Sequence, residues 1–250
     1  MRSKYRAECS PRGRWVVAHR GFSGRYPENT MAAFRAAVAL GVDAIEIDVH
    51  LSRDGHVVIM HDAKLDRTTD GKGPIAEHTL AEIKRVDAGS KKGAQFAGER
   101  VPTFAEMLAE ISLPVMCEIK DPGEDIVRET ARVVKAAGAE DRVIIACFDD
   151  ATLRWAEHYL PACERLALGQ STAERIRTTH INAPSFEQAD EAFVKAVHET
   201  HGAVWLWTVD EPADIRKVIA LGVDGIISNY PDRVLAALAQ GSASSTNATA

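Results

Sequence analysis

The sequence AIEIDVHLSRDGHVVIMHD, residues 44–62, decides the fold because it holds two apolar runs separated by an Asp-Gly pair. Asp54-Gly55 between such runs is a strong signal for a β-hairpin, and a hairpin joins antiparallel strands. Adjacent parallel strands instead need a crossover connection of about a dozen residues or more. The run at residues 57–60 is therefore predicted to turn back beside the first run, as an excursion from a parallel sheet.

Outside this segment, short β-branched runs alternate with amphipathic helical stretches. Apolar runs this short, separated by helices, are typical of buried parallel strands. Eight such units predict a closed TIM (β/α)₈ barrel, with a β-hairpin and a small insertion after strand 2. The predicted strands cover residues 15–18, 44–49, 115–119, 143–147, 165–168, 180–183, 204–209 and 225–228. The predicted helices cover residues 31–40, 104–111, 126–137, 152–159, 186–200, 213–221 and 232–238.

The sequence predicts one barrel domain, residues 14–240, with irregular segments around it. Residues 1–13 are polar, and residues 241–250 (GSASSTNATA) have no apolar periodicity, so both ends are predicted to be disordered. Residues 63–102 are rich in Gly, Lys and Asp and form a long insertion before the next helix. Long insertions of this kind are often functional, so this one is predicted to act as a lid or a substrate wall.

Composition limits the classes of partner. The net charge of −6 gives the chain as a whole no attraction to nucleic acid or to anionic membranes. No apolar run approaches the roughly 18 residues of a membrane span, and the first 15 residues lack an apolar leader, so a cytoplasmic location is expected. The spacing of the four cysteines suits neither a zinc site nor a disulfide framework. An anionic small molecule would have to be attracted locally, by a metal or by a few basic side chains.

Two histidines are predicted to lie at the C-terminal rim of the barrel. In a TIM barrel, catalytic groups lie at the C-terminal ends of the strands. The first strand ends in His19-Arg20, which pairs a natural acid or base with a planar fork for phosphate. The returning arm of the hairpin ends in His61-Asp62 and would deliver a second histidine from above. Two histidines beside a metal would act as base and acid in a displacement at phosphorus.

Carboxylates follow the same face of two predicted strands. Alternation places Glu46 and Asp48 on one face of the second strand, and Glu118 and Lys120 on one face of the third. Carboxylates on one face inside a barrel would repel each other and lose hydration. A hard divalent cation, Mg²⁺ or Ca²⁺, would remove both problems. The alternative is a salt bridge, in which Lys120 pairs with the carboxylates.

Three further positions have two possible roles each. Glu28 lies in the loop that precedes a helix and would orient a rim histidine, while Asn29 or Thr30 would cap that helix. Trp207 lies near the end of the seventh strand and would pack on the carbon skeleton of a substrate, although strand aromatics more often belong to the core. His180 would line the pocket, whereas the remaining histidines, His50 among them, are predicted to lie at the surface.

The ordered set of these motifs resembles the glycerophosphodiester phosphodiesterase family over residues 15–238. Any one motif is common, whereas the set in this order is highly specific. The motifs are His19-Arg20-Gly21, Glu28-Asn29-Thr30, Glu46-x-Asp48, His61-Asp62, Glu118-x-Lys120, Trp207-Thr208-Val209 and the closing run GVDGII at residues 222–227.

The resemblance implies a (β/α)₈ enzyme that cleaves glycerophosphodiesters to glycerol 3-phosphate and an alcohol with bound Ca²⁺ or Mg²⁺. The implied roles are metal ligation by Glu46, Asp48 and Glu118, catalysis by His19 and His61, phosphate contact by Arg20 and Lys120, and support of His19 or of the metal shell by Glu28. Two positions depart from the family pattern. Asp210 stands where members often have Asn, and Asn229 stands where many have Asp; both lie near the predicted rim and bear on substrate preference.

Other functions remain compatible with the same barrel. One is a phospholipase D-like lyase that forms cyclic phosphates, although those enzymes are secreted and disulfide-bonded and this chain shows neither sign. Another is an enzyme acting on sugar-phosphate or opine phosphodiesters. A third, from a different class, is a catalytically inactive barrel that binds a metabolite, against which the complete set of acid/base and carboxylate residues argues.

Overall fold

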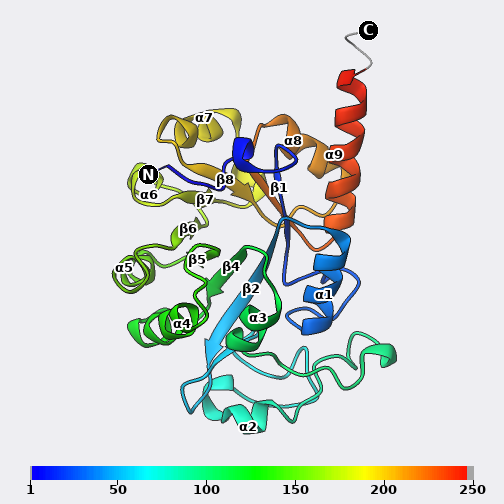
Figure 1. Cartoon of the computed structure of the whole chain (residues 1–250), viewed down its shortest axis with the longest axis vertical. Helices are drawn as coiled ribbons and strands as arrows, with labels where there is room; N and C mark the ends of the chain where they lie inside the picture. The colour runs from blue at the N-terminus through cyan, green and yellow to red at the C-terminus, as the bar shows by residue number, and fades with distance from the viewer. Residues whose placement is uncertain (1, 247–250) are drawn as a thin grey trace.

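A closed ring of parallel strands lies at the centre of the computed structural model, which describes residues 2–246 (Figure 1). Its strands are β1 (Trp15–Ala18), β2 (Ala44–Leu51), β4 (Val115–Ile119), β5 (Val143–Cys147), β6 (Glu164–Leu168), β7 (Ile181–Ala183), β8 (Ala203–Leu206) and β9 (Gly225–Ser228). They follow one another around the ring in chain order, and β1 pairs with both β2 and β9. The predicted TIM barrel is confirmed.

Helices surround the ring on its outside (Figure 1). The α-helices of this layer are α1 (Met31–Leu40), α3 (Phe104–Glu110), α4 (Glu124–Ala136), α5 (Asp150–Tyr159), α6 (Ala173–Thr178), α7 (Glu191–Glu199), α8 (Pro212–Ala220) and α9 (Pro231–Thr246). Short 3₁₀ helices are η1 (Ala7–Cys9) and η4 (Phe186–Gln188). Alternation along each strand divides the core in two. On β2, for example, Ile45 and Ile47 pack outward into the helix layer, whereas Ala44 belongs to the smaller cluster inside the barrel.

The hairpin after β2 forms as the sequence predicts. Strand β3 (Val57–Ile59) pairs with β2 in the antiparallel sense, and Val49 lies opposite Ile59. The backbone N–H of Met60 then donates to the carbonyl of Asp48 at 2.9 Å. This returning arm brings the chain back to the C-terminal end of β2, so the residues that follow Met60 are delivered to the barrel mouth.

The insertion between β3 and α3 packs around an apolar cluster of its own. Its helices are η2 (Ile75–Glu77), α2 (Leu80–Ile83) and η3 (Ala94–Phe96). The cluster contains Val58, Met60, Leu65, Ile75, Ile83, Ala88 and Val101. Since Val58 and Met60 come from the hairpin, the insertion is anchored on the same arm that leads to the mouth. Figure 1 shows the insertion, with α2, extending beyond one side of the strand ring.

Residues 2–13 pack against the barrel, which corrects the prediction of disorder for this part of residues 1–13; residue 1 lies outside the described residues. Tyr5 is 2% exposed and stacks edge-on against Trp205, whose indole donates to the Tyr5 carbonyl at 3.2 Å. The hydroxyl of Ser3 donates to the Glu164 carboxylate at 2.6 Å. Glu164 is the first residue of β6, and Trp205 lies on β8 in the cluster inside the barrel. The polar composition predicted disorder, but a few specific contacts, such as those of Tyr5 and Ser3, hold the segment across the bottom of the barrel without a continuous apolar face.

The C-terminal end also differs from the prediction. Helix α9 continues to Thr246 and so runs past residue 240, where the tail was predicted to become disordered. Residues 247–250, the rest of that predicted tail, lie outside the described residues. Over the part of the chain that the structure describes, none of the helices is long and apolar enough to cross a membrane.

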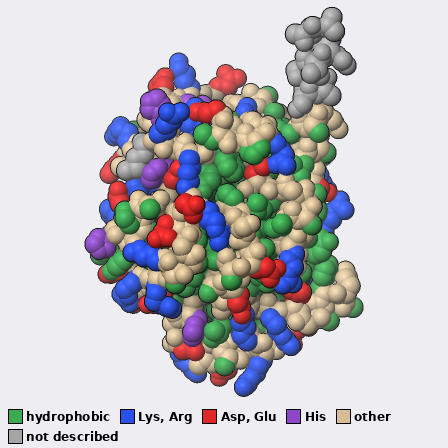
Figure 2. Space-filling view, viewed as in Figure 1, with side chains coloured by type: hydrophobic (Ala, Val, Ile, Leu, Met, Phe, Trp, Pro, Cys, Tyr) green, Lys and Arg blue, Asp and Glu red, His purple; other side chains and the backbone are tan. Residues whose placement is uncertain are grey.

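Charged side chains are dispersed over the face of the molecule that Figure 2 presents. Basic and acidic groups alternate there with apolar and uncharged ones, and neither sign gathers into one broad patch. A nucleic-acid-binding face normally carries clustered Lys and Arg.

Candidate active site

Three carboxylates meet inside the barrel mouth because β2 and β4 are neighbours. Their register places Asp48 directly opposite Glu118, and Glu46 lies two residues earlier on the same face. One oxygen from each of the three lies within 4.8 Å of the others, and all three residues are buried. Burial first, and then the charge of Asp48, raise the pKa of both Glu46 and Glu118. Each additional carboxylate thus makes it harder to ionise the others.

This cluster fits a divalent cation. Glu46 Oε1 and Asp48 Oδ1 are buried and have no hydrogen-bond partner among the described residues. Buried polar atoms are nearly always satisfied, and carboxylate oxygens are the preferred ligands of hard cations. A cation between these oxygens would satisfy both atoms and offset the repulsion among the three carboxylates.

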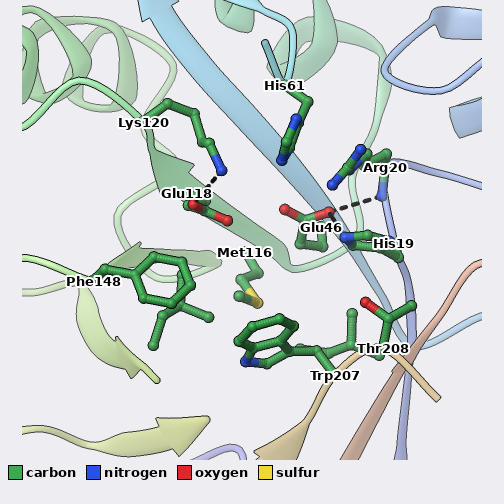
Figure 3. A pocket seen from close by; sticks show the side chains of 12 residues that line it. His19, Arg20, Glu46, His61, Met116, Glu118, Lys120, Phe148, Trp207 and Thr208 are labelled. Atoms are coloured by element: carbon green, nitrogen blue, oxygen red, sulfur yellow. Dashed lines mark hydrogen bonds and ion pairs between the residues drawn. The ribbon is translucent and has the colours of Figure 1, made fainter. Parts of the chain in front are cut away.

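Two basic side chains border the carboxylates. Lys120 Nζ lies 2.6 Å from Glu118 Oε1 and 3.6 Å from Asp48 Oδ1. Arg20 Nε lies 3.3 Å from Asp48 Oδ2, and the Arg20 backbone N–H donates to Glu46 Oε2 at 2.8 Å. The salt bridge that the sequence left open for Lys120 therefore exists, although Glu46 Oε1 and Asp48 Oδ1 still accept no hydrogen bond from the described residues. Figure 3 shows the side chains of Lys120 and Arg20 in the same pocket as Glu46 and Glu118.

In the loop after β1, Asn29 and Thr30 have different roles, although the sequence allowed either residue to cap the helix. Thr30 caps α1, since its side chain accepts from the N–H of Ala33. Asn29 instead points inward and donates from Nδ2 to Asp48 Oδ2 at 2.8 Å. This contact orients Asp48 and leaves its other oxygen directed to the cluster. Asn29 is a residue of the site that the sequence reading missed.

His19 is held by an amide rather than by a carboxylate. Its Nδ1 lies 2.8 Å from Asn229 Oδ1, which also accepts from the Ser23 hydroxyl at 2.7 Å. The Asn229 amide is oriented by donating from Nδ2 to Asp210 Oδ2 at 2.7 Å. With an oxygen acceptor at Nδ1, the neutral imidazole carries its proton there, and Nε2 lies 3.8 Å from Glu46 Oε2.

The surroundings of His19 favour a neutral imidazole at neutral pH. Burial first, and then the charge of Arg20, lower the pKa of His19 to about 4, despite the opposing contribution of the Asn229 hydrogen bond. An unprotonated Nε2 at the mouth is free to take up a proton. The two departures from the family pattern, Asp210 and Asn229, therefore lie behind this histidine rather than on the substrate side of the pocket.

His61 reaches the mouth from the hairpin and faces the carboxylate side of the pocket (Figure 3). Its Nδ1 lies 2.7 Å from Asp62 Oδ1, and its carbonyl is 3.1 Å from Nε2 of His50. His50 is only 2% exposed, and its Nδ1 lies 2.6 Å from Asp121 Oδ2. The prediction that His50 lies at the surface is therefore wrong. Alternation along β2 was the available signal, because His50 shares the face of Glu46 and Asp48.

Glu28 has partners other than those expected. Its carboxylate makes no hydrogen bond with His19 and does not join the carboxylate cluster; instead its Oε1 accepts from Arg20 Nη1 at 3.0 Å and from Arg67 Nη2 at 2.7 Å. Burial alone would raise the pKa of Glu28, but the hydrogen bonds of Arg67 and the charge of Arg20 outweigh it and lower the pKa to about 2. Glu28 therefore supports the site through Arg20. Arg67, on the insertion, was not recognised from the sequence.

The opposite wall of the pocket is apolar. Trp207 stacks edge-on with Phe148 at 5.8 Å between ring centroids, and its indole donates to the Ala183 carbonyl at 2.7 Å. Phe148 directly follows β5 and is 49% exposed. Both rings lie across the pocket from His61 and Lys120 (Figure 3). The pocket, with a volume of about 120 Å³, thus combines a charged side with an apolar side.

His180 does not line this pocket. It precedes β7, at the opposite end of the barrel, where its Nδ1 accepts from the backbone N–H of Arg165 at 3.1 Å. Burial, followed by the charge of Arg165, lowers the pKa of His180 to about 4. A residue at the start of a strand projects at the wrong end for catalysis in a TIM barrel. The expectation of a pocket residue is corrected.

The fold and the site define a (β/α)₈ barrel protein with an acidic, histidine-bearing pocket at the catalytic face. Residues 19–233 match the model of the glycerophosphoryl diester phosphodiesterase family. A glycerophosphodiester phosphodiesterase of Caldanaerobacter subterraneus is 38% identical over 88% of this chain and 96% of its own length. One from Bacillus altitudinis is 32% identical over the same shares. The chain belongs to the glycerophosphoryl diester phosphodiesterase family.

Solved structures agree with this assignment. A phosphodiesterase of Oleispira antarctica, determined in complex with the product sn-glycerol-3-phosphate, superposes with a TM-score of 0.85 at 32% identity. The match covers 90% of this chain and 96% of that one. A glycerophosphodiester phosphodiesterase from Agrobacterium tumefaciens str. C58 gives a TM-score of 0.78 at 26% identity, over 89% and 99% of the two chains.

Proposed function

We propose that this protein hydrolyses glycerophosphodiesters to glycerol 3-phosphate and an alcohol, in a reaction that depends on a divalent metal and on two histidines. The observation that carries the proposal is the pocket itself. His19 and His61 arrive from separate segments and line one cavity with Glu46 and Glu118. The family match and the glycerol-3-phosphate complex of the Oleispira antarctica enzyme support the substrate class.

Glu46, Asp48 and Glu118 would hold Mg²⁺ or Ca²⁺. When bound, the cation would neutralise the phosphodiester and the negative charge that develops on it. Arg20 and Lys120, which border the carboxylates, would contact the remaining phosphate oxygens. Together these groups overcome the net charge of −6 locally and allow an anionic substrate to enter the mouth.

The histidines would divide the proton transfers between them. His19 has the features of the base, because Asn229 holds its proton at Nδ1 and its lowered pKa keeps Nε2 unprotonated. His61, whose Nδ1 faces Asp62, would donate a proton to the leaving alkoxide. The attacking oxygen belongs either to water or to the free hydroxyl of the glycerol, and the second route passes through a cyclic phosphate.

The apolar wall would receive the carbon skeleton of the substrate. Trp207 is anchored through its indole N–H to Ala183, so its ring presents a fixed face to the pocket. Phe148 lies beside it at the rim and is half exposed. An apolar surface facing a charged one would orient a phosphodiester with its phosphate towards the cations.

Turnover of glycerophosphocholine, glycerophosphoethanolamine and bis(p-nitrophenyl) phosphate tests the proposal. We expect release of glycerol 3-phosphate with added Mg²⁺, Ca²⁺ or Mn²⁺, and none in EDTA. Phosphorus NMR identifies the products: a cyclic phosphate that accumulates as the final product indicates a lyase, and metal binding without any turnover indicates an inactive metabolite-binding barrel. Either result contradicts the proposed hydrolysis.

Substitution of each histidine tests whether both His19 and His61 take part in proton transfer. His19→Ala and His61→Ala should each lower kcat by more than about 100-fold while the protein remains folded, since acid/base catalysis typically contributes that much. His56→Ala is the matched control, because His56 is half exposed and lies at the hairpin turn. Near-normal turnover of either active-site variant would remove that histidine from the mechanism.

A further inference from the structure

We infer that Arg67, on the insertion between β3 and α3, is a positioning residue that fixes His61 through Asp62 and ties it to the loop after β1. The inference rests on the proposed function, in which His61 transfers a proton. It assigns to the insertion a part in assembling the site, beyond that of a lid or wall.

One side of the Arg67 guanidinium forms two hydrogen bonds with Asp62. Its Nε donates to Asp62 Oδ2 at 2.7 Å, and its Nη2 lies 2.9 Å from Asp62 Oδ1. Asp62 Oδ1 is the same atom that accepts from His61 Nδ1 at 2.7 Å. Two parallel hydrogen bonds hold a carboxylate in one orientation. The direction of the His61 ring is therefore set by a carboxylate that Arg67 holds in place.

The other side of the guanidinium forms two hydrogen bonds with Glu28. Nη1 donates to Glu28 Oε2 at 2.9 Å, and Nη2 donates to Glu28 Oε1 at 2.7 Å. Glu28 Oε1 also accepts from Arg20 Nη1 at 3.0 Å. Arg67 thus joins the hairpin to the loop after β1, two segments that carry the two histidines. A lysine offers one ammonium point and would not form both pairs of bonds.

His61 needs such an anchor because of where it lies. Strand β3 ends at Ile59, so the ladder of strand hydrogen bonds stops before this histidine. The side chains of His61 and Asp62 are 31% and 32% exposed, which lets water compete for the contact between them. The hydrogen bonds of Arg67, above all, lower the pKa of Asp62, so this residue stays an ionised acceptor for Nδ1–H. The hydrogen bonds of the Arg67 guanidinium therefore hold His61, through Asp62, where strand pairing does not.

Steady-state kinetics of Arg67→Ala and Arg67→Lys test the inference. We expect kcat to fall by about 10- to 100-fold, the usual effect of removing a group that orients a catalytic one, with KM changed by less than about 2-fold. Lysine should recover little, because it restores the charge without the fork. Arg100→Ala is the matched control: this arginine lies in the same insertion but, among the described residues, donates only to the backbone carbonyls of Arg85 and Val86.

A double-mutant cycle with Asp62→Asn separates positioning from other roles. If Arg67 acts through Asp62, the double variant Arg67→Ala/Asp62→Asn should lose little more kcat than Asp62→Asn alone. Fully additive losses, or an effect of Arg67→Ala confined to KM, would overturn the inference. Thermal unfolding of each variant identifies any loss of kcat that arises from loss of the fold. If Arg67→Ala does not fold, Arg67→Lys takes its place in the cycle.

A spectroscopic readout keeps the inference separate from the proposed function. Nitrogen-15 NMR of the histidine side chains reports which ring nitrogen carries the proton. At a pH where the ring is neutral, we expect His61 to carry its proton at Nδ1 in the wild type and to populate a mixture of tautomers in Arg67→Ala; the acid form in the proposed proton transfer carries protons on both ring nitrogens. Unchanged signals would overturn the inference even if the enzyme is active, whereas an inactive wild type with the expected change would refute only the proposed function.

Discussion

At the scale of the residue, the same chemical group behaves differently at the two ends of the barrel. His19 and His180 are both histidines with a pKa lowered to about 4, and burial is the main cause for each. His19 lies at the C-terminal ends of the strands, beside the carboxylates, whereas His180 accepts a backbone N–H at the start of β7. Position along the strand, rather than the size of the pKa shift, therefore distinguishes a catalytic candidate from a structural histidine.

The lowered pKa of His180 predicts a pH dependence of stability. Because its folded-state pKa lies below the ordinary value of 6.5, the neutral imidazole stabilises the fold fully above about pH 6.5. This contribution is lost as the pH falls from 6.5 towards 4. The wild type should thus lose more unfolding free energy than His180→Gln between pH 7 and pH 5, measured by urea titration. His19 titrates in both proteins and cancels in this comparison; parallel losses would contradict the prediction.

At the scale of the element, segments outside the eight barrel strands complete the molecule at both ends. The hairpin and insertion build one side of the mouth, and the N-terminal segment closes the bottom. Tyr5 is central to that closure, since its ring centroid lies 5.0 Å from that of Trp15 and 5.7 Å from that of Trp205. Aromatic groups dominate the energetics of such contacts. The segment therefore belongs to the core and stabilises the barrel from the end opposite to catalysis.

Substitution of Tyr5 tests the contribution of this segment. Tyr5→Ala should lower the free energy of unfolding by about 3 kcal/mol, the range for removal of a buried aromatic side chain. Tyr5→Phe keeps the ring and should stay within about 1 kcal/mol of the wild type. Denaturant unfolding measures both. Because the site lies at the other end of the barrel, kcat of the folded Tyr5→Ala protein should be unchanged; an unaffected stability would show that the segment contributes no packing energy.

At the scale of the whole molecule, the barrel brings together like charges that destabilise it unless a cation is bound. The pKa of Glu46 lies above its usual value, so its ionised form costs stability at neutral pH in the metal-free protein. Binding only to the folded state stabilises a protein by about 2.7 kcal/mol at a ligand concentration of 100 times Kd. Binding of the proposed cation would therefore link assembly of the site to the stability of the fold.

Thermal unfolding with and without Mg²⁺ or Ca²⁺ measures this linkage. Saturating metal should raise the Tm of the wild type by about 5–10 °C, since 1 kcal/mol corresponds to about 2–4 °C in a chain of this size. In EDTA, Glu46→Gln should have a higher Tm than the wild type, because it removes one charge from the cluster. Glu199→Gln, on the exposed side of α7, is the control. A metal-induced rise of equal size in Glu46→Gln would contradict the assigned site.

Sequence periodicity was enough to predict most of the site, for a definite reason. A strand alternates with period two, so Glu46 and Asp48 had to share a face, and barrel closure had to bring that face towards Glu118. Where a strand ends depends instead on its pairing with neighbouring strands, which alternation does not show. Strand β8 ends at Leu206 rather than at residue 209, since its neighbour β7 ends at Ala183 and leaves only a single bridge from Ser185 to Trp207.

By itself, the sequence determined the barrel, the hairpin and the rim positions of the carboxylates and histidines, because all of these follow from local pattern and strand order. Only the tertiary structure decided the partners: Asn229 behind His19, Arg67 behind Asp62, and Tyr5 beneath the barrel. These contacts join residues between 5 and 210 positions apart. Local pattern specifies which way a side chain faces, whereas the group that it meets depends on how distant segments pack.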